Sequence, residues 1–124
     1  MRRLLIFIAL SGCAPAARGP VSSDALAVEL TGRTAGAAQT CVSTMPNQGL
    51  RVINSRTLAY ESGRTLWINR LKDACPSLEP FNTAIVEASA GHYCRGDRVR
   101  GLEPGASIPG PACNLDDWTP YRLP

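Results

Sequence analysis

The sequence predicts an all-β fold: a small, mainly antiparallel β domain held by disulfides, preceded by a signal peptide and a flexible tether. Three observations predict it. Apolar residues recur at every second position in short runs, turn-forming residues separate these runs, and no apolar pattern of helical period extends beyond about ten residues. The chain also carries five cysteines in 124 residues, and cysteine pairs commonly stabilise small exported domains.

The amino terminus has the pattern of an export signal. Met1-Arg2-Arg3 is basic, and residues 4–10 form an unbroken apolar run. At about 1.5 Å per residue, a helix of that length reaches only about 10 Å, whereas the hydrocarbon core of a bilayer is about 30 Å thick. The run therefore predicts a cleaved secretory signal rather than a transmembrane helix.

The apolar run ends in Leu10-Ser11-Gly12-Cys13, which resembles the lipobox of bacterial lipoproteins. The resemblance implies removal of residues 1–12 and attachment of lipid, including palmitate-type acyl chains, to Cys13. Two or more acyl chains hold a protein stably at a membrane, at about 0.8 kcal/mol per buried methylene. An ordinary signal peptide that happens to end in a cysteine is the alternative.

Ala14 follows the predicted lipidation site, where an Asp would imply retention at the inner membrane by resemblance to sorting in enteric bacteria. The expected location is therefore the bacterial cell envelope, on the periplasmic face of the outer membrane. Loss of Arg2 and Arg3 with the signal reduces the thirteen basic residues to eleven, against ten acidic ones. A net charge of +1 argues against a nucleic-acid partner, because binding phosphates requires concentrated positive charge.

The remaining chain divides into a tether and a domain. Residues 13–28 are small, partly Pro-containing and without period, which is typical of a flexible tether. Ser22, Ser23 and Asp24 are helix-capping residue types, and they predict one short helical turn through Leu30. Residues 29–124 are expected to form the disulfide-containing β domain.

The strands of this domain are predicted from alternation and turn residues. Residues 57–61 and 65–70 read as a β-hairpin about Ser62-Gly63. Gly and Pro residues between 103 and 112 predict a loop. Further strand-like segments are residues 50–52, 83–89, 97–99 and 113–118.

With Cys13 lipidated, four cysteines remain: Cys41, Cys75, Cys94 and Cys113. None forms a C-x-x-C pair, which disfavours zinc, and an even number in an exported chain favours two disulfides over metal ligands or free thiols. Three pairings are compatible with the sequence. We prefer Cys75–Cys94, whose loop holds one extended run that could fold back, together with Cys41–Cys113, which would tie the two ends of the domain.

From Glu29 onward a series of short elements follows in order: Glu29-Leu30, Gly32-Arg33, Gly36, Cys41-Val42, Leu50-Arg51-Val52-Ile53, Leu58-Ala59-Tyr60, Leu71, Cys75-Pro76, Leu78, Tyr93-Cys94-Arg95-Gly96-Asp97, Ile108-Pro109-Gly110, Cys113-Asn114-Leu115 and Pro120-Tyr121. In these elements the chain resembles a family of small proteobacterial envelope proteins of unknown function, the DUF6491 type. The resemblance implies an exported or lipidated cysteine-containing domain and carries over no catalytic residue.

No catalytic residue, metal site or cofactor is predicted. His92 is the only histidine, and we expect it in a turn or at a strand edge. Asp116 and Asp117 are adjacent, so on a strand they would point to opposite faces, unlike a glycosidase pair. Arg95-Gly96-Asp97 spells an integrin-binding tripeptide, but a tight turn in which Asp97 accepts hydrogen bonds from backbone amides is the better interpretation.

Almost every basic residue is arginine, which grips phosphates or carboxylates in bidentate fashion and stacks on rings. A patch beside Trp67, Tyr60 or Tyr93 would suit lipid headgroups or glycan, although scattered charge balanced by acids is the simpler expectation. The candidates are Arg51, Arg56, Arg64, Arg70, Arg95, Arg98 and Arg100.

These observations predict a membrane-anchored envelope lipoprotein that acts as a non-enzymatic structural or interaction module. Its partners would be the membrane, through Cys13, and an envelope protein or glycan. A small hydrolase or inhibitor-like module is the alternative, and it would need a pocket that gathers His92 or two convergent carboxylates. Carriage of a lipid would need an apolar cavity that so short a chain can scarcely enclose.

Overall fold

The computed structural model describes residues 12, 21–46, 48–88 and 90–124. The predicted signal peptide (apart from Gly12), Cys13 and tether residues 14–20 lie outside the described residues. In chain order the elements are α1 (Val21–Leu30), β1 (Thr34–Ala35), β2 (Cys41–Ser43), β3 (Leu50–Asn54), β4 (Thr57–Ser62), β5 (Thr65–Arg70), β6 (Thr83–Glu87), β7 (His92–Cys94), β8 (Arg98–Leu102), β9 (Cys113–Asn114) and β10 (Trp118–Arg122).

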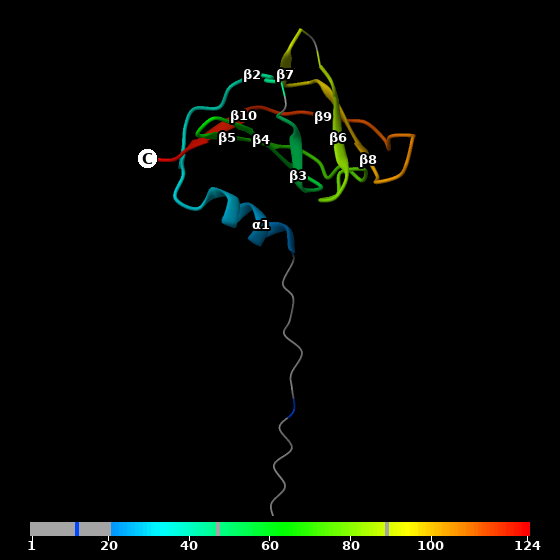
Figure 1. Ribbon diagram of the computed structural model, residues 1–124, viewed down its shortest axis with the longest axis horizontal. Coiled ribbons are helices and arrows are strands. Elements are labelled where there is room, and N and C mark those ends of the chain that lie inside the picture. The colour runs from blue at the N-terminus through cyan, green and yellow to red at the C-terminus, as the bar shows by residue number, and fades with distance from the viewer. Residues whose placement is uncertain (1–11, 13–20, 47, 89) are drawn as a thin grey trace, which may run out of the picture.

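The strands form three antiparallel sheets, so the predicted all-β class is confirmed, with one short helix added (Figure 1). The main sheet has five strands in the order β1-β10-β5-β4-β3. A two-stranded ribbon pairs β2 with β7, and a three-stranded sheet has the order β6-β8-β9. The two smaller sheets cover one face of the main sheet, and α1 lies against the other (Figure 1).

The main sheet is buried on both faces because of this layering. Four consecutive residues of β4, from Thr57 to Tyr60, are buried, with Leu58 and Tyr60 on one face and Ala59 on the other. On the first face a core of buried residues joins all three sheets. Its members are Val42, Val52, Leu58, Tyr60, Leu71, Cys75, Leu78, Val99, Leu115 and Trp118.

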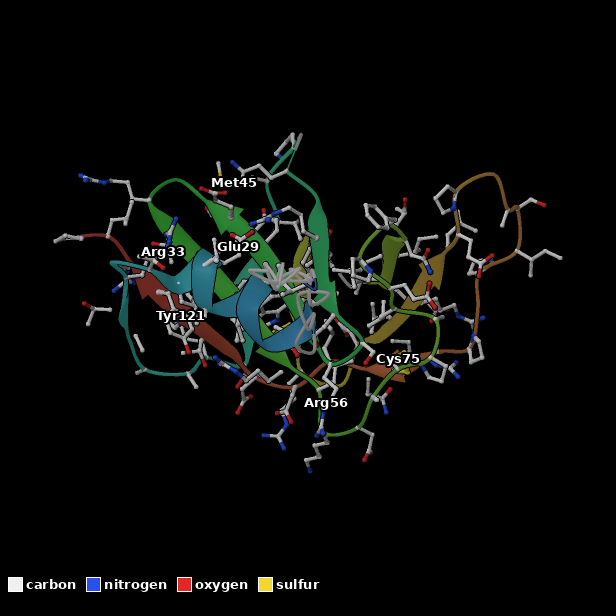
Figure 2. All side chains as sticks on the ribbon, turned by 90° about the horizontal axis from the view of Figure 1, so that it is seen from below. Glu29, Arg33, Met45, Arg56, Cys75 and Tyr121 are labelled. Atoms are coloured by element: carbon white, nitrogen blue, oxygen red, sulfur yellow. A yellow bond between two sulfur atoms is a disulfide. The ribbon has the colours of Figure 1, made fainter. Side chains whose placement is uncertain are left out.

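Helix α1 corrects the predicted boundary of the tether. Residues 21–28, which the sequence places in the flexible tether, form most of a helix that continues to Leu30. A helix of ten residues is marginal by itself in water, and packing usually supplies its stability. Here Ala25, Leu26 and Leu30 pack on a second, smaller core of Ile53, Ala59, Leu66 and Ile68. Figure 2 shows α1 lying across this face, with Glu29 on the helix and Arg33 and Tyr121 beside it.

The β4–β5 hairpin confirms the sequence interpretation, with Ser62 paired to Thr65 and Gly63 at a φ of 60°. Strand β10 extends past Pro120, which the sequence alone did not predict. Proline interrupts a ladder only where its missing N–H would be needed. The Pro120 carbonyl accepts a hydrogen bond from the amide of Gly36 at 2.7 Å. Gly36 lies beyond the end of the two-residue strand β1, so the backbone of Pro120 faces a segment outside the β1–β10 ladder, and the ladder loses no hydrogen bond there.

Both disulfides exist, but the preferred pairing was wrong. The structure joins Cys41 to Cys94 and Cys75 to Cys113. Cys41 and Cys94 are paired directly across the β2–β7 ribbon, and neither strand of this ribbon was predicted. Register between strands far apart in sequence depends on tertiary packing, so loop lengths alone could not select this pairing.

Candidate functional site

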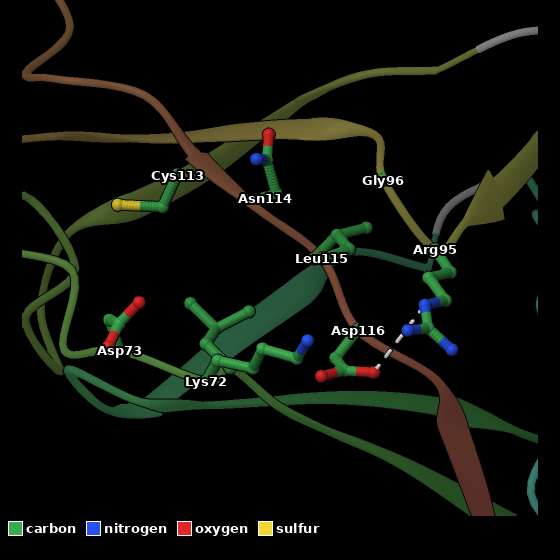
Figure 3. Close-up of a pocket in the computed structure, with 9 residues that line it drawn as sticks. Lys72, Asp73, Arg95, Gly96, Cys113, Asn114, Leu115 and Asp116 are labelled. Atoms are coloured by element: carbon green, nitrogen blue, oxygen red, sulfur yellow. Dashed lines mark ion pairs between the residues drawn. The ribbon is translucent and has the colours of Figure 1, made fainter.

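The candidate site is a surface pocket of about 400 Å³ where three segments meet beside the Cys75–Cys113 disulfide (Figure 3). The segments are the loop after β5, the turn between β7 and β8, and β9 with the loop that leads to β10. The residues that line the pocket are Leu71, Lys72, Asp73, Arg95, Gly96, Cys113, Asn114, Leu115 and Asp116.

A buried amide fixes one wall of this pocket. Asn69 on β5 is fully buried, and its side chain makes two hydrogen bonds with the backbone of Asp116. The Asn69 Nδ2 donates to the Asp116 carbonyl at 2.7 Å, and the Asp116 amide donates to Oδ1 at 2.9 Å. The Asp117 amide donates to Asp116 Oδ1 at 2.7 Å. The carboxylate of Asp116 is therefore held in place at the pocket wall.

Arg95 enters the pocket from the tight turn that the sequence predicted. Gly96 adopts a φ of 88°, and the Asp97 carboxylate accepts a hydrogen bond from the Cys94 amide at 2.8 Å. The turn interpretation of Arg95-Gly96-Asp97 is thereby confirmed. The Arg95 guanidinium lies 3.9 Å from Asp116 Oδ1 and 3.4 Å from Asp117 Oδ2. A side chain that is half exposed thus bridges the adjacent carboxylates, and Figure 3 shows its ion pair with Asp116.

Lys72 and Asp73 complete the charged lining. The Lys72 carbonyl accepts a hydrogen bond from the Arg56 guanidinium, which fixes the loop. Within the described parts of the chain, the Lys72 ammonium and the Asp73 carboxylate have no ion pair with another side chain. Two cations and two carboxylates therefore line one pocket, and one charge of each sign is unpaired. The arrangement suits a ligand group that carries both charges.

Sequence reasoning did not single out Asn69, Lys72 or Asp73. A pattern of strand alternation could have placed Asn69 on the inner face beside Leu58, where a polar residue needs partners when it is buried. Nothing in the sequence indicates that its partner is the backbone of Asp116, 47 positions away.

A second pocket of about 330 Å³ lies between the segment after Cys75 and the loop at 103–112. Ser77 contributes to its lining, but its hydroxyl is occupied. Ser77 Oγ accepts a hydrogen bond from the Gly101 amide at 2.9 Å and donates to the Pro111 carbonyl at 3.0 Å. This serine serves the packing of the fold rather than chemistry in the pocket.

His92 lies at the outer face of the β2–β7 ribbon and outside both pockets. Its Nδ1 lies 3.4 Å from Ser43 Oγ on the opposite strand, longer than a strong hydrogen bond. In the portion of the chain that the structure describes, no hydrogen bond joins the His92 ring to a carboxylate, and no cluster of three or more His, Cys, Asp or Glu side chains could hold a metal ion.

The arginines that were candidates for a surface patch contact separate partners. Arg51 pairs with Glu29, Arg100 with Glu87, and Arg95 with Asp116 and Asp117. Arg64 donates to the Pro124 carbonyl at 3.3 Å. Arg70 lies 5.6 Å from the centre of the Tyr121 ring and donates to its hydroxyl, whereas Tyr60 is fully buried. Scattered charge balanced by acids, the simpler expectation, matches these contacts.

Three groups with shifted pKa values lie away from the pocket lining. Hydrogen bonds from Arg51 lower the pKa of Glu29 despite its partial burial, and the same contact raises the pKa of Arg51. Burial raises the pKa of Tyr93, as does the neighbouring Tyr60, whose ring lies edge-on at 5.7 Å. The contacts that cause these shifts also attach α1 and the β2–β7 ribbon to the main sheet.

Comparison with protein-family models, with curated proteins and with solved structures gives no match. None of the helices in the described residues is long and apolar enough to cross a membrane.

Proposed function

We propose that this chain is a lipoprotein of the bacterial cell envelope, anchored through Cys13 to the periplasmic face of the outer membrane, with a folded domain that acts as a non-enzymatic interaction module. The Leu10-Ser11-Gly12-Cys13 motif supports the anchor. Two disulfides support an oxidising compartment, because cytosolic proteins of this size rarely carry them. The resemblance to the DUF6491-type envelope proteins points the same way.

The single observation that carries the interaction role is the mixed charge of the pocket beside the Cys75–Cys113 disulfide. Lys72 and Asp73 stand at its lining without ion-pair partners among the described residues, and Arg95 and Asp116 face the same space. Solvated charges in a concave site are available to a partner. We propose that the pocket receives a protein segment that carries both an ammonium or guanidinium group and a carboxylate.

The distance between anchor and domain is short. Eight residue steps separate Cys13 from the first residue of α1 at Val21. Even a fully extended chain of that length spans at most about 29 Å. The proposed partner is therefore an envelope protein close to the membrane surface, within reach of a domain that stays near its lipid.

Metabolic labelling with a palmitate analogue tests the anchor. Wild-type protein is expected to incorporate the label and to fractionate with membranes, whereas Cys13→Ser should lose both properties. Unchanged labelling of Cys13→Ser would overturn the lipidation proposal.

Site-specific photocrosslinking in cells tests the interaction site. A photoreactive residue at Asn114, in the pocket lining, should give a discrete adduct, whereas one at Val28 on the outer face of α1 (74% exposed) should not. Lys72→Met and Asp73→Asn should each reduce the Asn114 adduct several-fold. An adduct that forms equally from Val28, or that survives both substitutions, would overturn the role of the pocket.

The hydrolase alternative retains one supporting observation, because the pocket brings two carboxylates, Asp73 and Asp116, to one lining. We favour the interaction role since Asp116 is already bound by Arg95 and by the Asp117 amide. Turnover of a glycan or peptide substrate that is lost in Asp73→Asn would reverse this choice.

A further inference from the structure

The disulfide between Cys41 and Cys94 lies at the surface of the molecule. Its two residues are directly opposite each other on the antiparallel strands β2 and β7, with a Cα–Cα distance of 4.0 Å. Cys41 is exposed and Cys94 is half-buried. In the other disulfide Cys75 is fully buried and belongs to the main core, so an incoming thiol could reach that bond only through the half-buried Cys113 in the pocket lining, whereas Cys41 is open to solvent.

The β2–β7 ribbon is attached to the fold independently of this disulfide. Side chains alternate along each strand, so Val42 and Tyr93 point inward while both cysteines point outward. Val42 is buried, and the Tyr93 ring packs on Tyr60 at 5.7 Å and on Trp118 at 6.4 Å. Cleavage of the disulfide would therefore leave the inner face of the ribbon in contact with the core.

The ribbon also keeps its hydrogen bonds at both ends. The Arg95 amide donates to the Thr40 carbonyl at 2.8 Å, next to the disulfide. At the other end both the amide and the hydroxyl of Thr44 donate to the Gly91 carbonyl, each at 2.9 Å. The β2–β7 ribbon therefore has its own backbone hydrogen bonds and its own contacts with the core. For this reason the Cys41–Cys94 disulfide on its surface can open without unfolding the domain.

The same disulfide adjoins the candidate pocket. Cys94 directly precedes Arg95 and Gly96, which line it, and the Cys94 amide and carbonyl are both bonded within the turn by Asp97. The position of the Arg95 guanidinium opposite Asp116 thus depends on where β7 ends. Release of Cys94 from Cys41 removes one constraint on that end.

We propose that Cys41–Cys94 is a thiol-exchange site, reduced by an exported dithiol protein while Cys75–Cys113 stays closed. A thiolate of the donor attacks one sulfur of the pair and forms a mixed disulfide, and the other cysteine leaves as a thiolate that takes up a proton. The second donor thiol, as its thiolate, then attacks the mixed disulfide. The products are two thiols, at Cys41 and Cys94, and a disulfide in the donor, so two electrons have moved.

Differential alkylation tests this selectivity. Full-length protein, extracted in detergent from expressing cells, is treated with dithiothreitol for increasing times, quenched with an alkylating reagent and mapped by mass spectrometry. Cys41 and Cys94 should become alkylated at least tenfold faster than Cys75 and Cys113. Equal rates, or earlier opening of Cys75–Cys113, would overturn the proposal.

Hydrogen exchange on the same samples tests whether the fold survives. Selective opening should increase exchange at residues 91–97 while peptides from β4 and β5 keep their protection. Loss of protection in β4 and β5 together with cleavage of Cys41–Cys94 would overturn the proposal, because it would make this disulfide a requirement for the whole fold.

Matched double variants separate the two crosslinks. Cys41→Ala/Cys94→Ala should retain the protection of β4 and β5, and Cys75→Ala/Cys113→Ala should lose most of it. If the second variant does not fold, the alkylation rates of the wild-type protein alone decide whether Cys41–Cys94 opens first.

Acid quenching of living cells tests whether an exported donor reduces this disulfide. Partial reduction of Cys41 and Cys94 with full oxidation of Cys75 and Cys113 supports the proposal, and full oxidation of both pairs overturns it.

Discussion

The two faces of the main sheet are covered in different ways. On one face, ten buried residues from the three sheets and the loops between them form a continuous core that includes Cys75 of the Cys75–Cys113 disulfide. On the other, α1 covers only four buried residues and is held at its edge by the bidentate pair of Glu29 and Arg51. Packing therefore dominates the first face, whereas the second relies on a small apolar contact and charge. The charged pocket lies at the border of the first face, next to the Cys75–Cys113 disulfide and the hydrogen bonds between Asn69 and Asp116.

The largest expected effect is at the close approach between β8 and the segment after Cys75. A Cβ added at Gly101 would lie 1.7 Å from the Ser77 carbonyl oxygen and 2.5 Å from its carbonyl carbon. Backbone cannot move aside as a flexible side chain does, so we expect Gly101→Ala to lower the free energy of unfolding by about 4 kcal/mol or more. Urea unfolding of the oxidised protein measures this loss.

Gly49→Ala is the matched control, because nothing lies within 4 Å of a Cβ at that position. Its unfolding free energy should stay within about 0.5 kcal/mol of wild type. Equal losses of unfolding free energy for the two alanines would show that the first face accommodates an added methyl group as easily as a surface loop does. That result would contradict the conclusion that packing dominates the first face.

A smaller loss is expected at the rim of the same face, where Asn69 clamps Asp116. Asn69→Asp removes the Nδ2 donor, so a buried carboxylate would face the Asp116 carbonyl. A buried polar group that loses its partner costs about 1 to 3 kcal/mol, and more when it is charged, so we expect a loss of roughly 3 kcal/mol at neutral pH. Thermal and urea unfolding both report this value.

Asn114→Asp makes the same chemical change at an exposed position in the same pocket. It should change the unfolding free energy by less than about 0.5 kcal/mol. If Asn69→Asp costs no more than Asn114→Asp, the clamp does not hold the pocket wall, and the pocket is less preorganised than its geometry implies.

Local signals in the sequence predicted local structure well, but they could not predict contacts between residues far apart in the chain. Alternation and Ser62-Gly63 predicted the β4–β5 hairpin, and the Gly and Pro residues predicted the loop at 103–112, because these signals act between near neighbours. The partner of Cys94 and the role of Asn69 depend on strand packing over 53 and 47 positions. Helix α1 depends on a sheet that forms far along the chain, so its capping residues indicated only a turn. The pocket likewise forms where three segments that are far apart in the sequence come together.

The smallest expected effect is on the α1 face, at the pair of Glu29 and Arg51. Arg51 Nη1 and Nη2 donate to the two carboxylate oxygens at 2.6 and 3.0 Å, which lowers the pKa of Glu29 in the folded state. A lowered pKa stabilises the fold above the unfolded-state value of about 4.3, and this contribution disappears as the pH falls through the folded-state value. Both side chains are partly exposed, so the pair is worth less than about 1 kcal/mol.

Glu29→Gln should therefore destabilise the protein by less than about 1 kcal/mol at pH 7, and the difference from wild type should vanish at acid pH. Urea unfolding at several pH values between 7 and 3 measures the difference, with Glu103→Gln, which removes no ion pair among the described residues, as the control. A deficit that persists at acid pH would mean that Glu29 acts by packing. The α1 face would then resemble the core face, and charge would no longer distinguish the two.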